Sequence, residues 1–357
     1  MQTRLQAAWE HRGWLARLLW PVSVVFAALV AIRRQLYRWG LFQRHRLPVP
    51  VLTVGNMAVG GTGKTPMTVA IVQHLQAMGH HPVVVSRGYG GSARSPVRVD
   101  TLAPNPNLTG DEPLLLARLA KAPVWVGPDR VAVAQAALAA DPQVNMVVLD
   151  DGMQHWRLVS DVLVVLFDQR GLGNRWLLPA GLLREPWPPT TWGATTFWVQ
   201  TPGVPPASTQ PLPSHLPVYT TTRRLASTAC NRQGDTVDLA VLADRRPLGA
   251  VAGIAHPQRF FDMLEAQGLH LAHRRAAADH ADTNSLMTSL TPGTCWLCTD
   301  KDAVKLFAAP TPPGATPLDI WAVGLETQTD PAFWTDLTQA VNRVVNGLSS
   351  RDGRKTA

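Results

Sequence analysis

Cysteine is scarce in this 357-residue chain, which contains only Cys230, Cys295 and Cys298. Three thiols are too few for a disulfide framework, so the composition favours a reducing compartment. Cys295 and Cys298 have the spacing C-x-x-C, but the sequence offers no second such pair and no nearby paired histidines. Because both lie in an apolar, strand-like run, we expect buried strand cysteines rather than zinc ligands or a redox pair.

Acidic residues are in the minority, with 25 Asp and Glu against 33 Lys and Arg and a net charge of +8. Such a balance suits nucleic acid, an anionic membrane surface or an acidic substrate, and alone it does not choose among them. The imbalance is sharpest in the first 46 residues, which hold eight arginines, no lysine and a single acid, Glu10. Beyond this start the sequence lacks a clustered Lys/Arg groove motif, which disfavours a nucleic-acid-binding protein.

The apolar run at residues 14–32 is short for a membrane span, with about fifteen uninterrupted residues after Arg17 against the usual 17–25 or so. No small-residue cleavage site follows, so a cleaved secretory signal is not expected. Arg33, Arg34 and Arg38 follow instead, among apolar and aromatic residues. We expect residues 1–46 to form a hydrophobic and basic membrane-anchoring segment at the cytoplasmic leaflet. The alternative is a soluble helix buried against the body.

A glycine-dense turn lies between an expected strand and an expected helix. The apolar residues 51–54 lead into Gly60, Gly61, Thr62, Gly63, Lys64 and Thr65, and an apolar-periodic segment follows at 67–78. In this pattern backbone N–H groups and a helix N-terminus face a phosphate, the lysine reaches the β- and γ-phosphates, and the Thr65 hydroxyl binds Mg²⁺. Ala58 replaces the first glycine of G-x-x-x-x-G-K-[ST]. The sequence therefore predicts a nucleoside triphosphate site.

Strands alternate with helices between residues 50 and 168, which predicts an α/β fold with a P-loop NTPase-type parallel sheet covered by helices. Residues 201–217 contain six prolines and no charge, so we read them as a linker or surface loop. We expect a P-loop core at 47–217, a smaller C-terminal α/β domain at 218–345 and a disordered tail at 346–357.

Carboxylates stand at two expected element ends. An apolar strand at 144–149 runs into Asp150 and Asp151, which downstream of a P-loop predicts a Walker B pair that orients Mg²⁺. Turn chemistry is the alternative for Asp151 and His155. Asp111 and Glu112 begin a helix, where they either complement its dipole or place a carboxylate in the cleft, and the residues leave both open.

The motifs taken in order resemble the tetraacyldisaccharide 4′-kinase family over nearly the whole chain. They are VGNMAVGGTGKTP, SRGYGG, GDEP, DDGMQHWRL, GNRWLLPAGLLREP, GIAHPQRFF, ADH and TDKDAVK. The chain departs from the family pattern at Arg175, where glycine is common, at Leu182, where proline is usual, and at Asp300, where glutamate is usual. The series in this order is highly specific.

The resemblance implies an ATP- and Mg²⁺-dependent kinase at the cytoplasmic face of the bacterial inner membrane. Its acceptor would be the 4′-hydroxyl of an acylated glucosamine disaccharide 1-phosphate, giving lipid IVA in lipid A biosynthesis. A lipid acceptor accounts for an apolar N-terminal segment, and its phosphate accounts for the arginine surplus there. The expected partners are thus this substrate and the membrane leaflet, without nucleic acid.

The resemblance also implies residue roles. Asp111 would be the general base, with His280 from the C-terminal domain orienting it, and Lys64 would contact the phosphates. Further active-site or acceptor contacts implied by the family motifs are Asn174, Arg184, Glu185, Gln154 and His155. If Asp111 and His280 cooperate, the cleft lies between two domains.

A membrane-associated partition-type P-loop ATPase is the rival reading from another class. Those proteins carry a second lysine just before the Gly-Gly pair, where this chain has Val59. They also favour a C-terminal amphipathic helix, whereas the apolar segment here is N-terminal. Both features favour the kinase.

Overall fold

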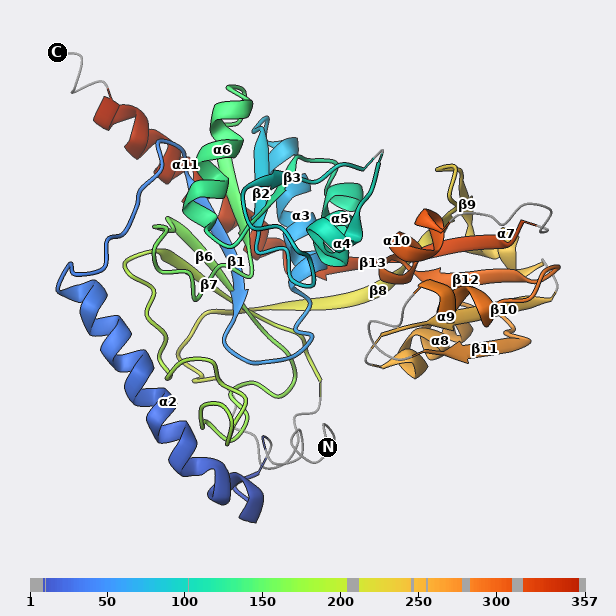
Figure 1. Ribbon diagram of the computed structural model, residues 1–357, viewed down its shortest axis with the longest axis horizontal. Coiled ribbons are helices and arrows are strands. Elements are labelled where there is room, and N and C mark those ends of the chain that lie inside the picture. Colours follow the sequence, from blue (N-terminus) through green and yellow to red (C-terminus); the bar gives the residue numbers. More distant parts are fainter. Residues whose placement is uncertain are drawn as a thin grey trace.

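The computed structural model describes residues 9, 11–101, 103–203, 212–244, 247–254, 256–277, 283–309 and 317–352. The chain forms two lobes that are joined by two long strands, β8 (Val218–Cys230) and β13 (Asp319–Thr329), as Figure 1 shows. β8 pairs with β7 of the larger lobe over residues 218–220 and with β13 over residues 221–230. One sheet therefore runs through both lobes.

The larger lobe is built on a mostly parallel sheet with the order β7-β6-β1-β5-β2-β4-β3, in which only the edge pair of β3 and β4 is antiparallel. Its strands are β1 (Val51–Asn56), β2 (Pro82–Ser86), β3 (Val97–Arg98), β4 (Val124–Val126), β5 (Met146–Asp150), β6 (Val162–Phe167) and β7 (Thr195–Gln200). Parallel strands end at a common edge, so the carboxyl ends of β1, β5 and β6 lie side by side. The predicted α/β class is confirmed.

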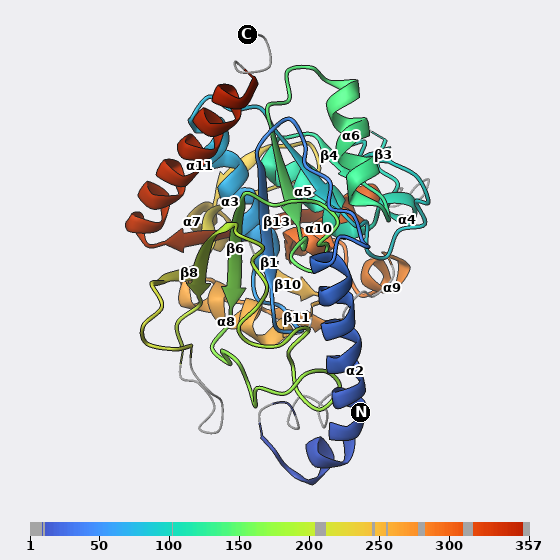
Figure 2. The same ribbon diagram turned by 90° about the vertical axis from the view of Figure 1, so that its left-hand side faces the viewer.

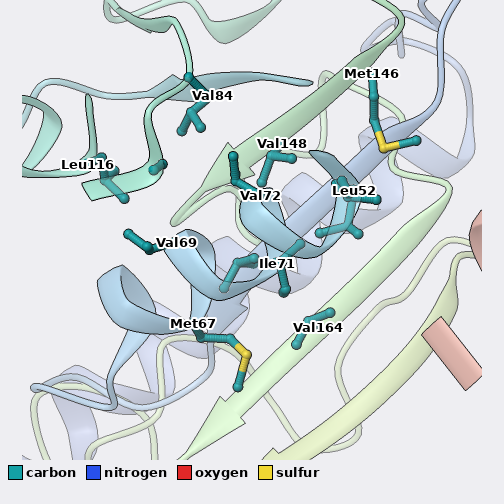
Figure 3. Packing of buried hydrophobic residues seen from close by; sticks show 14 of the residues in the cluster. Leu52, Met67, Val69, Ile71, Val72, Val84, Leu116, Met146, Val148 and Val164 are labelled. Carbon is teal, nitrogen blue, oxygen red and sulfur yellow. The ribbon is translucent and has the colours of Figure 1, made fainter. Parts of the chain in front are cut away.

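Helices cover both faces of this sheet. One face packs on α3 (Lys64–Ala77), α5 (Asp111–Ala120), which follows the short α4 (Pro106–Thr109), and α11 (Pro331–Asp352), and the other packs on α6 (Arg130–Ala140). Leu52 and Val54 point to the first face and Val51 to the second, the period-2 alternation of a strand buried on both sides. Figure 3 shows the packing of α3 on this sheet through Met67, Ile71 and Val72, with Leu52, Val148 and Val164 opposite.

The smaller lobe has the strand order β11-β10-β12-β13-β8, with β9 paired to β8. Its further elements are β9 (Thr236–Asp238), α7 (Leu239–Ala243), β10 (Leu248–Ala252), α8 (Pro257–Ala266), β11 (His273–Ala276), α9 (Thr283–Thr288), β12 (Cys295–Thr299) and α10 (Asp300–Ala308). Cys295 and Cys298 lie on β12, buried and unbridged, and they face opposite clusters of the lobe. This confirms the expectation of buried strand cysteines.

The C-terminal segment differs from the sequence prediction. The sequence predicts that residues 331–345 belong to the smaller domain and that residues 346–357 form a disordered tail. Instead α11 continues to Asp352, and Phe333, Leu337 and Val341 pack into the core of the larger lobe. The chain therefore crosses between the lobes twice, outward on β8 and back on β13.

Helix α2 (Trp14–Arg38) extends along one side of the larger lobe (Figure 2). Among the described residues it is the one helix whose length and composition suffice to cross a membrane. Ala16 and Ser23 are its only buried residues, whereas Leu18, Val25 and Leu29 are each about 60% exposed or more. An apolar helix is confirmed, and the alternative of a helix buried against the body does not fit this exposure.

Candidate active site

The glycine turn lies between β1 and the first residue of α3, Lys64. Gly60 has φ 123° and Gly63 has φ 86°, a left-handed region in which a side chain is strained. Ala58 does not take a positive φ, is fully buried and forms a bridge with Leu183. The alanine is therefore compatible with the turn, although the consensus has glycine there.

The side chain of Asn56, the last residue of β1, stabilises the glycine turn through two hydrogen bonds. Its Nδ2 donates to the Ala58 carbonyl at 2.6 Å and to the Thr62 hydroxyl at 2.9 Å, and all three residues are buried. Asn56 is a site residue that the sequence motifs alone do not indicate. The available signal was a polar residue at the end of a largely apolar strand, four residues before Gly60.

Asp150 ends β5 beside β1 and is buried. Its carboxylate accepts hydrogen bonds from Thr68 Oγ1 at 3.2 Å and from Ser86 Oγ at 3.3 Å. Burial, and then the neighbouring charges of Asp151 and Glu112, raise the pKa of Asp150 to about 6. A buried carboxylate among other acids is electrostatically costly unless a cation compensates it.

Asp151 lies next to it in a left-handed conformation with φ 48°. Its Oδ1 is 3.9 Å from Lys64 Nζ and 3.0 Å from Arg184 Nη1, so the Walker B region, the P-loop lysine and the loop before β7 meet at this carboxylate. Arg130 Nη2 donates to the Asp151 carbonyl at 3.2 Å. The predicted pairing of the P-loop with a Walker B carboxylate is thus present in space.

The residues fit a magnesium ion. Asp150 and Asp151 offer carboxylates and Thr65, at the first turn of α3, offers a hydroxyl, and such oxygens are the donors that Mg²⁺ prefers. Asp150 makes no ion pair with any residue that the structure describes. Within the same residues there is no group of three or more His, Cys, Asp or Glu that could hold a metal alone. A Mg²⁺ here would keep water or phosphate oxygens as further ligands, as it commonly does.

Gln154 links two of the other predicted contacts, Glu185 and Arg184, to the end of β1. Its Nε2 donates to the Asn56 carbonyl at 3.1 Å and to Glu185 Oε1 at 2.9 Å, and its Oε1 lies 3.4 Å from Arg184 Nη1. Glu185 is buried, and burial raises its pKa, opposed first by the hydrogen bond from Gln154. Arg184, Glu185 and Gln154 therefore form one network with Asp151.

His155 and Asn174 lie apart from this network. His155 lines a small cavity with Arg44, Trp156 and Trp192, and burial lowers its pKa to about 4. The Asn174 side chain closes its own loop, since Nδ2 donates to the Ala180 carbonyl at 2.9 Å and Oδ1 accepts from the Trp176 N–H at 2.9 Å. Contact of either residue with an acceptor stays a prediction.

The loop at 173–186 packs against α2. The Ser23 hydroxyl donates to the Leu177 carbonyl at 2.9 Å and accepts from the Ala180 N–H at 2.9 Å. At Arg175 the backbone has φ 63°, the region that favours glycine, which explains why glycine is common in the family at this position.

Asp111 begins α5 at the edge of the larger lobe, and its Oδ2 is 3.1 Å from Lys305 Nζ on α10 of the smaller lobe. The neighbouring Glu112 is close enough to affect Asp150, so this helix start faces the Walker B carboxylate. His280, the predicted partner of Asp111, lies outside the described residues. Asp111 thus lies where the two lobes meet, in contact with a lysine of the smaller lobe, and its cooperation with His280 stays a prediction.

Arg170 is a second site residue that the sequence motifs alone do not indicate. Its guanidinium donates to both carboxylate oxygens of Asp168, the residue after β6, and its Nη2 donates to the Val59 carbonyl at 3.0 Å. A Cβ at Gly60 would lie 2.7 Å from that Nη2, so the glycine admits the arginine. Its place in the chain could have indicated it, because Arg170 follows β6, whose carboxyl end is adjacent to that of β1.

A family model described as LpxK, tetraacyldisaccharide-1-P 4′-kinase, matches residues 15–342. The chain belongs to this kinase family. It is 43% identical to the tetraacyldisaccharide 4′-kinase of Polaromonas naphthalenivorans over 356 residues, covering both chains fully. It is 45% identical to that of Acidovorax sp. strain JS42 over 334 residues, which are 94% of this chain and 93% of the relative.

A solved structure of the same family has the same fold. The structure of LpxK from Aquifex aeolicus in complex with ATP matches with a TM-score of 0.75 and 26% identity, covering 92% of this chain and 99% of that one. The family assignment confirms the predicted tetraacyldisaccharide 4′-kinase, a phosphotransferase of lipid A biosynthesis. It does not favour the partition-type ATPase.

Proposed function

We propose that this chain transfers the γ-phosphate of ATP to the 4′-hydroxyl of a tetraacyldisaccharide 1-phosphate at the site formed by the P-loop and the Walker B carboxylates. The observation that carries the proposal is the meeting of Lys64, Asp151 and Arg184 within 4 Å at the carboxyl end of the parallel sheet. In open α/β sheets this edge is the usual place for ligands. Family membership supports the choice of acceptor.

Phosphoryl transfer depends mainly on positioning and on neutralising charge, so the roles follow from chemistry and place. The α3 N-terminus and Lys64 bind the phosphates. Asn56 and Arg170 stabilise the conformation of the glycine turn. Thr65, Asp150 and Asp151 would hold Mg²⁺, which would supply positive charge to offset the negative charge of the phosphates. Asp111 accepts the hydroxyl proton, and Lys305 positions its carboxylate from the other lobe.

The acceptor is an amphiphile, and the outward apolar face of α2 supports a membrane-associated enzyme. A helix of this kind either spans the bilayer or lies in it, with arginines at one end near anionic headgroups. ATP is a cytosolic nucleotide, so we place the catalytic lobes at the cytoplasmic face of the inner membrane. Ser23 connects α2 to the loop at 173–186, which brings this loop close to the lipid surface.

The test is direct. The protein is purified in detergent, incubated with γ-labelled ATP, Mg²⁺ and tetraacyldisaccharide 1-phosphate, and the lipid product is separated. We expect label on the lipid and none when EDTA removes the metal. Hydrolysis of ATP with an unmodified acceptor would contradict the proposal.

A further inference from the structure

Arg223 on β8 lies against the phosphate turn although it is 160 residues away in the sequence. A Cβ built on Gly63 would be 3.4 Å from both Cζ and Nε of Arg223, so the flat guanidinium occupies the space beside the glycine that caps α3. β8 is one of the two strands that connect the lobes (Figure 1). Arg223 lies three residues after Thr220, the last residue that pairs with β7, and itself pairs with Thr327 of β13.

The guanidinium of Arg223 is partly buried and has no partner among the described residues, with which it makes neither a hydrogen bond nor an ion pair. Burial is the main cause that lowers the pKa of Arg223, and the charge of Asp168 opposes it. Arg170, on the other side of the turn, differs because its donors are occupied by Asp168 and the Val59 carbonyl. An arginine desolvated without an acceptor is costly, which indicates that an anion belongs beside it.

The surrounding charge also favours an anion. Lys64 begins the helix, and Arg259 of α8 is close enough to lower the pKa of Arg223 further. Asp168, the acid that acts on Arg223, is already paired with Arg170, and Asp151, the acid beside Lys64, is already paired with Arg184. A helix N-terminus, a lysine and an unpartnered planar guanidinium together match the oxygens of a polyphosphate.

We propose that Arg223 binds an oxygen at the β,γ end of ATP, so that the nucleotide joins the P-loop to the strand that links the lobes. The inference rests on the proposed kinase function and adds a phosphate-binding residue contributed from outside the P-loop core. The same chemistry could instead recognise the phosphate of the lipid acceptor, and the experiment separates the two.

The test measures nucleotide binding to the full chain in detergent without acceptor. Arg223→Ala should weaken ATP binding by about 10- to 100-fold, the usual loss for a hydrogen bond to a charged group, and should leave AMP binding unchanged. Arg223→Lys should recover part of the loss because it keeps the charge. The matched control is Arg224→Ala, since Arg224 is the exposed neighbour on the same strand and should bind ATP normally.

The melting temperature of each variant without nucleotide shows whether the fold is intact, and the ATP-dependent rise in Tm gives a second measure of affinity. If Arg223→Ala does not fold, the ATP affinities of Arg223→Lys and Arg223→Gln are compared with that of the wild type instead. Unchanged ATP affinity, an equal loss for AMP, or a rise confined to the KM of the acceptor overturns the inference. If the wild-type protein itself does not bind ATP, the proposed kinase function fails instead.

Discussion

Asp111 Oδ2 and Lys305 Nζ are 3.1 Å apart and belong to different lobes, Asp111 to the first turn of α5 and Lys305 to α10. Both side chains are mostly buried, with exposed fractions of 18% and 12%. A salt bridge sheltered in this way holds its partners more firmly than a surface pair does. The lobe orientation and the position of the predicted base are therefore coupled.

The first prediction concerns this pair. Asp111→Asn should lower kcat by about 10²–10⁴-fold, the range for loss of a general base, while ATP still binds. Lys305→Met should lower kcat by about 10–100-fold, because the ion pair that positions the carboxylate is lost. Steady-state kinetics with labelled ATP measure both.

The double variant decides whether the two residues act together. If Lys305 acts through Asp111, then Asp111→Asn with Lys305→Met should be hardly slower than Asp111→Asn alone. If the fold losses in kcat of the two single variants multiply in the double variant, Lys305 has a role separate from Asp111. Near-normal turnover of Asp111→Asn would show that Asp111 is not the general base.

Contiguous parts of the site could be predicted from sequence, whereas contacts between distant segments could not. The strand, glycine turn and helix at 51–77 are local in the chain, and Asp150 is predicted because an apolar strand downstream of the P-loop ends in aspartate. Lys305, Arg170 and Arg223 could not be found in this way, because their positions depend on how loops and lobes pack. No local pattern reports that packing.

The full lengths of β8 and β13, and the placement of α11, were not predicted from the sequence, and each of these differences has a physical reason. β8 and β13 extend between the two cores, so their polar side chains break the alternation that marks a half-buried strand. Helix α11 did carry a readable signal, since Phe333, Leu337 and Val341 recur at helical spacing and form its buried face. Its assignment to the smaller domain was wrong because that spacing does not say which core the face covers.

The second prediction concerns α2. Leu18, Val25 and Leu29 are exposed apolar side chains, and replacing all three by Gln should lower binding to phospholipid vesicles by 100-fold or more, since each buried aliphatic side chain contributes about 1.5–3 kcal/mol. Stability in detergent-free buffer should change little, because none of them packs inside the protein. Co-sedimentation with vesicles measures the binding.

Val241→Gln is the control for α2, because Val241 is 52% exposed and lies in the smaller lobe. It should leave vesicle binding unchanged. Undiminished binding of the triple variant would show that another surface attaches the protein to lipid.

The third prediction concerns Gln154, whose amide satisfies two acceptors at once. Gln154→Leu leaves the buried Glu185 carboxylate and the Asn56 carbonyl without this donor, which should lower the free energy of unfolding by about 2–4 kcal/mol. Urea unfolding measures the change. Gln73→Leu is the control, since Gln73 is exposed and its single bond to the Leu119 carbonyl should be worth about 0.5–1.5 kcal/mol at most. Equal effects of the two substitutions would argue against a structural role for the network at Asp151.

The last prediction concerns pH and Asp300, which stands where the family usually has glutamate. Burial raises the pKa of Asp300 from 3.8 to about 6. Between these values the folded protein holds a proton that the unfolded chain has lost, so the wild type loses stability as pH rises through this window and keeps the deficit above it. Asp300→Asn cannot ionise and should be more stable than the wild type by up to about 3 kcal/mol at pH 8, and by about half of that at pH 5.

The N-terminus of α10 stabilises the charged form of Asp300 by only about 0.3–1 kcal/mol, so this effect does not reverse the sign of the expected change. Unfolding at both pH values measures the difference, with the exposed Asp262→Asn as control. A gain equal at pH 5 and pH 8 would mean that the substitution acts through packing against Gly324 rather than through the charge.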